Sequence, residues 1–206
     1  MLCKQISLLL CVIFLFACRG RETNPSAGKQ AADSSPNPKD SIESAAQFFP
    51  VASYLMNEIE YVDSLPVGIV KYRSVGRKTD SSYISLDEFH GLASEFISPE
   101  LNDSNFRKGF QESSFMDRST SSATFFYKSL SPSQNIKRVD VVTAKGDVFD
   151  EVKSIYIEKQ VKQGNEVVNK KLFWKPKRNF QIITVNEDHS DKQVPELVKV
   201  VWDNRE

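Results

Sequence analysis

The chain has 206 residues, of which 27 are basic and 27 acidic, so its formal net charge is zero. Domains that bind nucleic acids usually carry a strong positive excess, and the sequence therefore predicts no nucleic-acid partner. Hydrophobic residues make up 40% of the chain and include 14 phenylalanines and two tryptophans, enough for one buried core. The length favours a single folded domain.

The first 18 residues resemble the signal of a bacterial lipoprotein. An apolar run covers residues 6–16, and Leu15, Ala17 and Cys18 match the pattern at which such signals are cut. The run is shorter than the roughly 20 residues of a membrane-spanning helix. The resemblance implies that residues 1–17 are a removed signal peptide, and that Cys18 carries a diacylglyceryl group and a fatty acid such as palmitate. An ordinary secretory signal or a short uncleaved anchor is the alternative.

Several acyl chains on one residue give lasting membrane attachment, because each buried methylene contributes about 0.8 kcal/mol. We therefore expect a protein of the bacterial cell envelope, anchored in the outer membrane and facing the periplasm, with exposure at the cell surface as the alternative. Cys3 and Cys11 lie within the signal peptide, so Cys18 is the cysteine that remains in the mature chain. The sequence thus predicts no disulfide and no thiolate metal site.

Residues 18–41 are predicted to form a disordered tether between the lipid and the folded domain. The segment is rich in Ser, Pro, Asn and charged residues and contains no aromatic residue. It cannot bury enough surface to offset the entropy lost on ordering. Ser41 and Ser64 each follow an aspartate and precede an apolar residue, a pattern that resembles O-glycosylation sites of Bacteroidota. We hypothesise a glycan at these serines, which an added hexose in the mass spectrum would reveal.

Residues 42–206 are predicted to form one domain that begins with a helix. Apolar residues at three- and four-residue spacing begin with Phe48 and predict a helix that starts near Pro50. The same pattern places Glu58 and Glu60 away from the apolar face of this helix.

Two strands and two more helices are expected next. Residues 67–77 alternate in character and predict a strand, with a short return strand over 82–85. Ser85 and Glu88 have the spacing of a capping box, which predicts the start of a second helix. A third, short helix is expected near residues 104–111.

From residue 113 onward the hydrophobic pattern has a period of two, which is typical of strands. Turn sequences separate seven candidate strands: 113–118, 122–129, 136–144, 151–161, 166–174, 179–186 and 196–203. Short connections and one polar face favour antiparallel pairing. The predicted fold class is α+β, with two or three N-terminal helices packed on a curved antiparallel sheet of about seven strands.

The sequence contains no recognised catalytic constellation. The mature chain has two histidines, His90 and His189, without a nucleophile motif, and it lacks a glycine-rich phosphate loop. Acidic residues at 186–191 and at 147–151 suggest weak calcium binding or paired carboxylates, but a solvated loop and a turn are the favoured interpretations. We therefore predict no catalytic residue, no cofactor and no metal site, and we favour a protein that is not an enzyme.

The most unusual charge pattern lies in residues 153–178, which carry eight basic and two acidic side chains. Five of the basic residues surround one predicted hairpin: Lys170, Lys171, Lys175, Lys177 and Arg178. We hypothesise that this hairpin meets an anionic polymer, a phospholipid surface or an acidic envelope protein. The alternative is a solvated sheet edge whose lysines discourage aggregation.

Several apolar fragments resemble a group of uncharacterised lipoproteins from Bacteroidota. They are Phe48-Phe49-Pro50-Val51 with Tyr54-Leu55, Asp63-Ser64-Leu65-Pro66, Leu172-Phe173-Trp174-Lys175 and Val200-Val201-Trp202. The resemblance covers residues 45–204. It implies envelope localisation and a single domain, and it transfers no activity or site residue.

The sequence is compatible with three functions. The leading hypothesis is a non-catalytic envelope protein that binds a partner or ligand through its sheet or its basic hairpin. A carrier of lipids or other hydrophobic ligands would need a concave sheet with a dry pocket. A hydrolase would need a cleft that holds a carboxyl group of perturbed pKa.

The substitution Cys18→Ser tests the lipid anchor. Because a serine hydroxyl cannot form the thioether to diacylglycerol, the variant should lose palmitate labelling and move from the membrane fraction to the soluble fraction. Cys11→Ser, within the signal peptide, is the control and should leave both properties unchanged. An uncut Cys18→Ser product that still fractionates with membranes would contradict the anchor.

Overall fold

The computed structural model describes residues 48–144, 151–164, 166–187 and 194–203. All of them belong to one structural unit, Ser44–Glu206. The predicted signal peptide, lipidated cysteine and tether lie outside the described residues, as do Ser41, His189 and the carboxylates of Asp147 and Asp150. Ser64, the other predicted glycosylation site, is exposed at the end of the first helix.

The described chain forms three α-helices, each close to its predicted place. They are α1 (Val51–Asp63), α2 (Leu86–Ala93) and α3 (Asp103–Gly109), with 3₁₀ turns at Ser94–Phe96 and Pro99–Leu101. Pro50 precedes α1, where its missing N–H removes no helical hydrogen bond. The Ser85 hydroxyl accepts a hydrogen bond from the Glu88 backbone N–H (3.2 Å), which confirms the predicted cap of α2.

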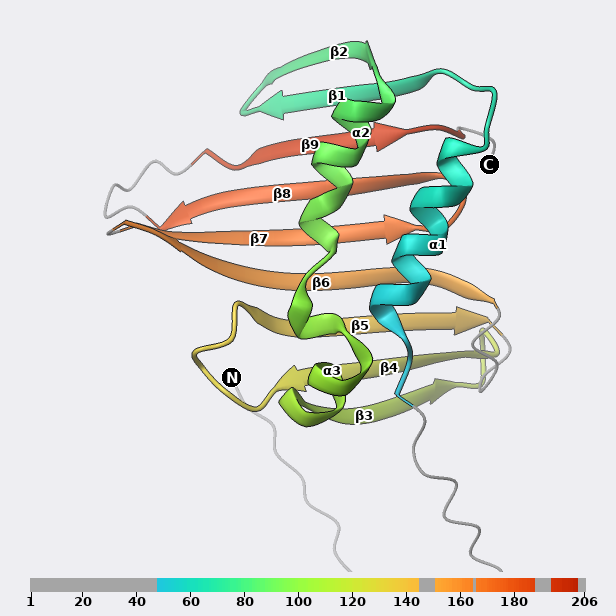
Figure 1. Ribbon diagram of the computed structural model, residues 1–206, viewed down its shortest axis with the longest axis vertical. Coiled ribbons are helices and arrows are strands. Elements are labelled where there is room, and N and C mark those ends of the chain that lie inside the picture. Colours follow the sequence, from blue (N-terminus) through green and yellow to red (C-terminus); the bar gives the residue numbers. More distant parts are fainter. Residues whose placement is uncertain (1–47, 145–150, 165, 188–193, 204–206) are drawn as a thin grey trace, which may run out of the picture. The chain divides into compact units, whose positions relative to one another are not determined.

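Nine strands form one antiparallel sheet in the described part of the chain. They are β1 (Ile69–Val75), β2 (Lys78–Ile84), β3 (Phe110–Asp117), β4 (Ser122–Ser129), β5 (Ile136–Ala144), β6 (Val152–Gln163), β7 (Glu166–Lys175), β8 (Asn179–Glu187) and β9 (Glu196–Val201). In space the order is β2-β1-β9-β8-β7-β6-β5-β4-β3, so β3 to β9 form a meander (Figure 1). The prediction of about seven strands counted only the later ones. Because β1 pairs with β9, the first hairpin joins the same sheet.

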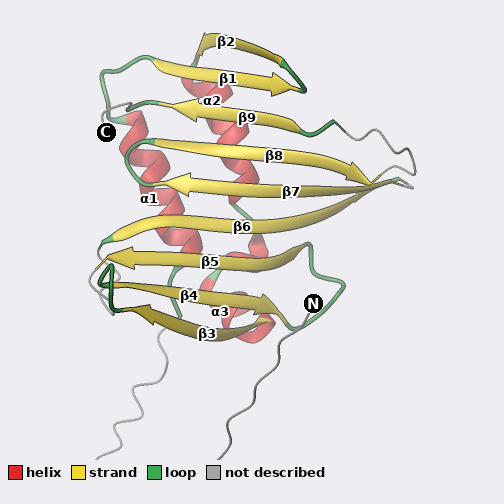
Figure 2. Cartoon of the chain, turned by 180° about the vertical axis from the view of Figure 1, so that it is seen from behind, coloured by secondary structure: helices red, strands yellow, loops and turns green. Residues whose placement is uncertain are grey.

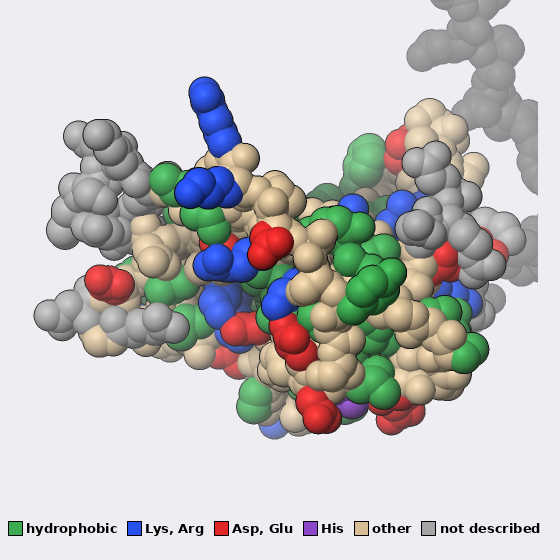
Figure 3. Space-filling view, turned by 90° about the horizontal axis from the view of Figure 1, so that it is seen from above, with side chains coloured by type: hydrophobic (Ala, Val, Ile, Leu, Met, Phe, Trp, Pro, Cys, Tyr) green, Lys and Arg blue, Asp and Glu red, His purple; other side chains and the backbone are tan. Residues whose placement is uncertain are grey.

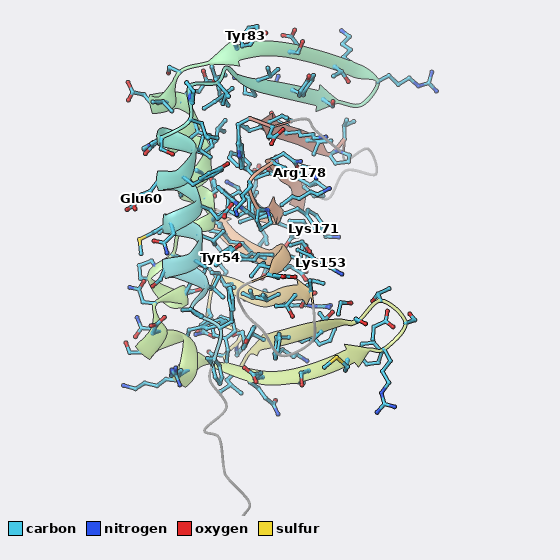
Figure 4. The ribbon with its side chains drawn as sticks, turned by 90° about the vertical axis from the view of Figure 1, so that its right-hand side faces the viewer. Tyr54, Glu60, Tyr83, Lys153, Lys171 and Arg178 are labelled. Atoms are coloured by element: carbon cyan, nitrogen blue, oxygen red, sulfur yellow. The ribbon has the colours of Figure 1, made fainter. Side chains whose placement is uncertain are left out.

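All three helices cover the same face of the sheet, and the other face carries none of them (Figure 1 and Figure 2). We call this uncovered side the helix-free face. The sheet is open, with β2 and β3 as its edges. It is also twisted, since the β1–β2 and β3–β4 hairpins both bend away from the helices when the unit is seen along its strands (Figure 4).

An aromatic cluster fills the space between the helices and the centre of the sheet. The ring centroid of Trp174, on β7, lies 5.1 Å from that of Phe96 and 5.2 Å from that of Phe180. Phe89 of α2 and Trp202 complete the cluster, with their rings 5.7 Å apart. All five side chains are buried. Each such burial contributes about 1.5–3 kcal/mol, so this cluster holds α2 and the following turn on the sheet.

Glu58 is a charged residue inside this apolar interface, contrary to the prediction that its side chain would point away from the sheet. The residue is only 7% exposed. Its Oε2 accepts hydrogen bonds from the Trp174 Nε1–H (3.3 Å) and from the Lys177 backbone N–H (2.8 Å). The carboxylate therefore satisfies two donors that come from the sheet side of the interface. Glu60 does point to solvent from α1, as predicted (Figure 4).

The substitution Glu58→Ala should lower the free energy of unfolding by about 2–4 kcal/mol, because two donors lose their acceptor at about 1–3 kcal/mol each. Glu60→Ala, on the exposed side of the same helix, should change it by less than about 0.5 kcal/mol. Urea unfolding of the purified protein measures both effects. Equal losses in the two variants would contradict the role assigned to Glu58.

Candidate functional site

Strand register assigns each side chain of the sheet to one of its two faces. Ile155 of β6 and Trp174 of β7 are paired and buried under the helices. Tyr156 and Phe173 are the adjacent pair, so they lie on the helix-free face, because successive side chains of a strand point to opposite sides. The same argument carried across the nine strands defines three rows of neighbouring residues on this face.

From β2 to β3 the central row contains Ser81, Tyr72, Lys199, Gln181, Phe173, Tyr156, Asp140, Phe126 and Ser113. One flanking row contains Thr79, Ser74, Leu197, Ile183, Lys171, Glu158, Arg138, Lys128 and Gln111. The other contains Tyr83, Val70, Val201, Asn179, Lys175, Ser154, Val142, Thr124 and Phe115. The three rows hold five cationic, two acidic and six aromatic side chains. The helix-free face therefore combines aromatic surface with an excess of positive charge.

One acid of this face is neutralised within the face itself. The Arg138 Nε–H donates to the Asp140 Oδ1 over 2.6 Å, and the Asp140 side chain is only 14% exposed. The same guanidinium lies 5.4 Å from the ring centroid of Phe126, within the range of a cation–π contact. Arg138 is thus committed to neighbours on its own surface, and the remaining cations provide the free positive charge.

The centre of the face is an aromatic pair on β6 and β7. The ring centroids of Tyr156 and Phe173 are 4.8 Å apart. Burial raises the pKa of the Tyr156 hydroxyl, and the nearby Glu158 carboxylate raises it further, so the hydroxyl stays protonated at neutral pH. Phe173 remains 39% exposed. The contact between the two rings holds Phe173 in position, while part of its ring remains exposed to solvent.

A hollow of about 590 Å³ opens beside this pair. Its lining residues are Lys153, Ser154, Phe173, Trp174, Lys175, Asn179, Gln181 and Ile183, and we call it the β6–β8 hollow. Lys153 and Lys175 form no ion pair with a described residue, and the side-chain amides of Asn179 and Gln181 form no hydrogen bond with one. Its volume lies within the range of about 300–1,000 Å³ that is common for ligand sites.

Lys153 reaches the β6–β8 hollow because of an irregularity in β6. The register between β5 and β6 shifts so that Val142 pairs with Ser154 but Thr143 pairs with Val152, which leaves Lys153 without a partner residue on β5. Such bulges change the direction in which a side chain points. Figure 4 shows Lys153 on the side of the sheet away from the helices.

A second hollow of about 470 Å³ lies on the same face over β4, β5 and β6. Ser113, Phe126, Tyr127, Lys128, Lys137, Arg138 and Glu158 line this β4–β6 hollow. The Lys137 ammonium donates to the backbone oxygens of Pro132 and Gln134, at 2.7 and 2.6 Å. Lys128 is exposed and has no ion pair within the described ranges, so it is the free cation of this hollow.

The five basic residues predicted around one hairpin are separated by the structure. Lys171 and Lys175 lie on the helix-free face, in the two flanking rows on either side of Phe173. Lys177 and Arg178 occupy the turn between β7 and β8, where Lys177 has a positive φ of 59°. Figure 4 shows Lys171 and Arg178 on the side of the sheet away from the helices, as it does Lys153. Four of the predicted residues thus remain candidates for contact with an anionic ligand.

Lys170, the fifth residue, points to the helix-covered side and is a structural residue. Its ammonium lies 2.5 Å from the Glu95 Oε1, and Lys159 lies 3.2 Å from the Glu95 Oε2. Burial opposes ionisation of Glu95, but hydrogen bonds and positive charge from both lysines outweigh it and hold the pKa of Glu95 below its usual value of 4.5. We therefore remove Lys170 from the candidate binding residues.

The described residues hold no arrangement suited to hydrolysis. His90 pairs at the surface with Asp63, at 2.7 Å. Hydrogen bonds from Ser119 and Thr120 lower the pKa of Asp117 to about 2 in an exposed turn, which favours a permanent anion rather than a proton donor. Within the described ranges there is no cluster of three metal-binding side chains.

Comparisons of the chain with protein-family models, with curated proteins and with solved structures gave no match. In the part of the chain that the structure describes, none of the helices has the length and apolarity needed to cross a membrane.

Sequence analysis missed three residues that the structure adds to the candidate surface. Lys153 and Lys199 are distant in sequence, and strand pairing places Lys199 beside Gln181. Alternation along the strand places Tyr156 on the side opposite Ile155, but its ring contact with Phe173 follows only once β6 is known to pair with β7 in this register. The basic composition of residues 153–178 was the available signal, and these residues form β6, β7 and the turn that follows β7.

The substitution Glu95→Gln should lower stability at pH 7 by less than about 1 kcal/mol, since this ion pair is partly screened by solvent. The folded-state pKa of Glu95 is depressed, so its contribution is present above about pH 4.5 and is lost as the pH falls through the folded-state pKa. The difference between wild type and variant in urea unfolding should therefore shrink from pH 7 to pH 3. A difference that is constant with pH would contradict the ion pair, and Glu60→Gln is the solvent-exposed control.

Proposed function

We propose that the chain is a lipid-anchored protein of the bacterial cell envelope that binds an anionic partner on the helix-free face of its sheet and catalyses no reaction. The observation that carries the proposal is the set of lysines around the β6–β8 hollow that form no ion pair with a described residue, on the face that the helices leave uncovered. The sequence-based expectation of a lipidated Cys18 and an outer-membrane location supplies the setting. Other envelope proteins and envelope polymers are the partners within reach of such an anchor.

Charge complementarity favours an anion as the partner. Lys153 on β6, Lys171 and Lys175 on β7, and Lys199 on β9 lie around the hollow and form no ion pair with a described residue. The two acids in the three rows are Asp140, which Arg138 neutralises, and Glu158. Like charges gathered on one surface repel one another, and a bound anion removes that repulsion and steers its own approach.

The alternative interpretation, lysines that protect a sheet edge from aggregation, does not fit their position. The edges of the sheet are β2 and β3. Lys171 and Lys175 belong to β7, the central strand of the order, which is hydrogen-bonded to β6 on one side and to β8 on the other. A lysine on the face of a central strand blocks no exposed backbone hydrogen-bonding groups, so edge protection gives no reason for these residues.

The two other functions have less support. A carrier of acyl chains would need space between the helices and the sheet, where the aromatic cluster around Trp174 packs ring against ring. The β6–β8 hollow on the outer face is open to solvent and includes two lysines in its lining, so it offers an acyl chain no dry enclosure. A hydrolase would need an acid with a raised pKa, whereas the shifted pKa values of Glu95 and Asp117 are both lowered.

Charge reversal at Lys171→Glu and Lys175→Glu should weaken binding of an anionic polymer about tenfold, because two favourable contacts become repulsive at about 1 kcal/mol or less each. Polyphosphate and polygalacturonate serve as probes, and binding to the full-length protein in detergent micelles is measured by calorimetry at low salt. Affinity should also fall as salt rises from about 0.05 to 0.5 M.

The control Lys78→Glu with Lys108→Glu reverses two exposed cations away from this face, on β2 and α3. It has the same net charge as the test variant and should bind the polymers like the wild type. Equal weakening in both variants would assign binding to net charge and contradict the surface. No binding of either polymer by the wild type would contradict the proposed function itself.

A further inference from the structure

The β6–β8 hollow presents three chemistries side by side. Phe173 offers part of an aromatic ring, Asn179 and Gln181 offer amides without a partner in the described structure, and Lys153 and Lys175 offer free positive charge. A site for inorganic anions would need only the lysines. A site for apolar ligands would exclude the amides, because a buried amide without a hydrogen bond costs free energy.

We infer that the hollow binds an acidic sugar unit of a glycan chain, with its ring over Phe173, its hydroxyl groups at Asn179 and Gln181, and its anionic group between Lys153 and Lys175. The inference deepens the proposed function and rests on it. The anionic group is a carboxylate or an ester of phosphate or sulfate, which share the same recognition by ammonium groups.

The aromatic ring is the element that distinguishes a sugar from a simple anion. One side of a pyranose carries mainly C–H groups, and a flat apolar ring is a suitable surface for it. The contact of Phe173 with Tyr156, at 4.8 Å between centroids, limits the motion of this ring before any ligand binds. A ring that is fixed in advance costs less entropy on binding than a mobile one.

The amides match the hydroxyl groups of a sugar ring. Asn179 and Gln181 are alternate residues of β8 and therefore point to the same side of the sheet. Each amide carries two N–H donors and one carbonyl acceptor, so the pair can donate to and accept from adjacent hydroxyls. Lys199, opposite Gln181 on β9, extends the positive surface beyond the amides.

The second hollow on the same face favours a polymer over a single sugar. Phe126 in the β4–β6 hollow and Phe173 in the β6–β8 hollow belong to the same row, three strands apart. Neighbouring strands are about 4.8 Å apart, which places the two rings roughly 14 Å from each other. A chain of linked sugars can occupy both hollows, and simultaneous contact raises its overall affinity. Lys128 supplies the free cation at the second position.

The substitution Phe173→Ala tests the sugar contact. We expect polygalacturonate to bind the full-length variant about five- to tenfold more weakly than the wild type, whereas polyphosphate, which has charge but no sugar ring, should bind both equally. Phe173→Tyr keeps the ring and should bind polygalacturonate like the wild type. Phe115→Ala removes another exposed phenylalanine of the helix-free face outside both hollows and should have no effect. Thermal unfolding shows whether each variant is folded.

A second measurement uses wild-type protein and so does not depend on variant folding. We expect trigalacturonate to displace polygalacturonate at a lower concentration than galacturonate does, and adenosine monophosphate to be the weakest competitor. Equal affinity for both polymers, with no effect of Phe173→Ala, would overturn the sugar assignment and leave the anion-binding function standing. Stronger competition by the nucleotide would assign the hollow to nucleotides instead. Absence of binding by either polymer would overturn both proposals.

Discussion

The fold depends on the packing of one helical layer against one face of an open sheet. Trp174, Phe180 and Phe96 meet at the centre of that interface, and their rings lie 5.1 to 5.2 Å apart. A sheet of nine strands has more area than three short helices cover, and all three helices lie on the same side (Figure 1). The opposite face must therefore meet solvent or a partner, and everything inferred about function concerns this face.

An open sheet also has to protect its edges. On β2 every residue except Ile84 is exposed, and Lys78 and Asp80 place charges along the strand. Seen from above, this end of the unit shows lysine, arginine and acidic side chains interspersed with hydrophobic ones (Figure 3). The strand is short and twisted, which together with its charges makes it a poor template for another chain. The β2 edge is thus protected from pairing with another chain without any contribution from the lysines of β7. Those lysines need a different explanation.

Local sequence was sufficient to predict most of the secondary structure, because alternation and helical spacing are properties of neighbouring residues. The strands predicted at 122–129 and 136–144 coincide with β4 and β5. Ser85 was predicted to cap α2 from the spacing of two residues, and it does. Assembly of the strands into one sheet of nine could not be predicted in the same way, since β1 and β9 are more than 100 residues apart in sequence.

The wrong predictions for single residues also arise because the contacts involved join residues that are distant in sequence. Glu58 is buried because its partners lie 116 and 119 residues away, and Lys170 is a structural residue because Glu95 is 75 residues away. Charge composition drew attention to β6 and β7, but the face on which each lysine lies depends on register. For Lys153 even the alternation fails, because the irregularity in β6 redirects that side chain.

The central row of the helix-free face breaks the rule that the open side of an antiparallel sheet is polar. Phe126, Tyr156 and Phe173 lie there on central strands, where no helix covers them. Phe126 and Tyr156 are half-buried and Phe173 is exposed, and apolar surface on an uncovered face favours aggregation, so a purely structural face would do better with threonine or serine. Lys153, Lys171 and Lys175, which form no ion pair with a described residue, lie on β6 and β7 and on the same side of the sheet. In folded proteins, departures from the expected residue pattern concentrate at functional sites. Here two independent departures, the aromatic ring of Phe173 and the positive charge of Lys153 and Lys175, occur together at the β6–β8 hollow.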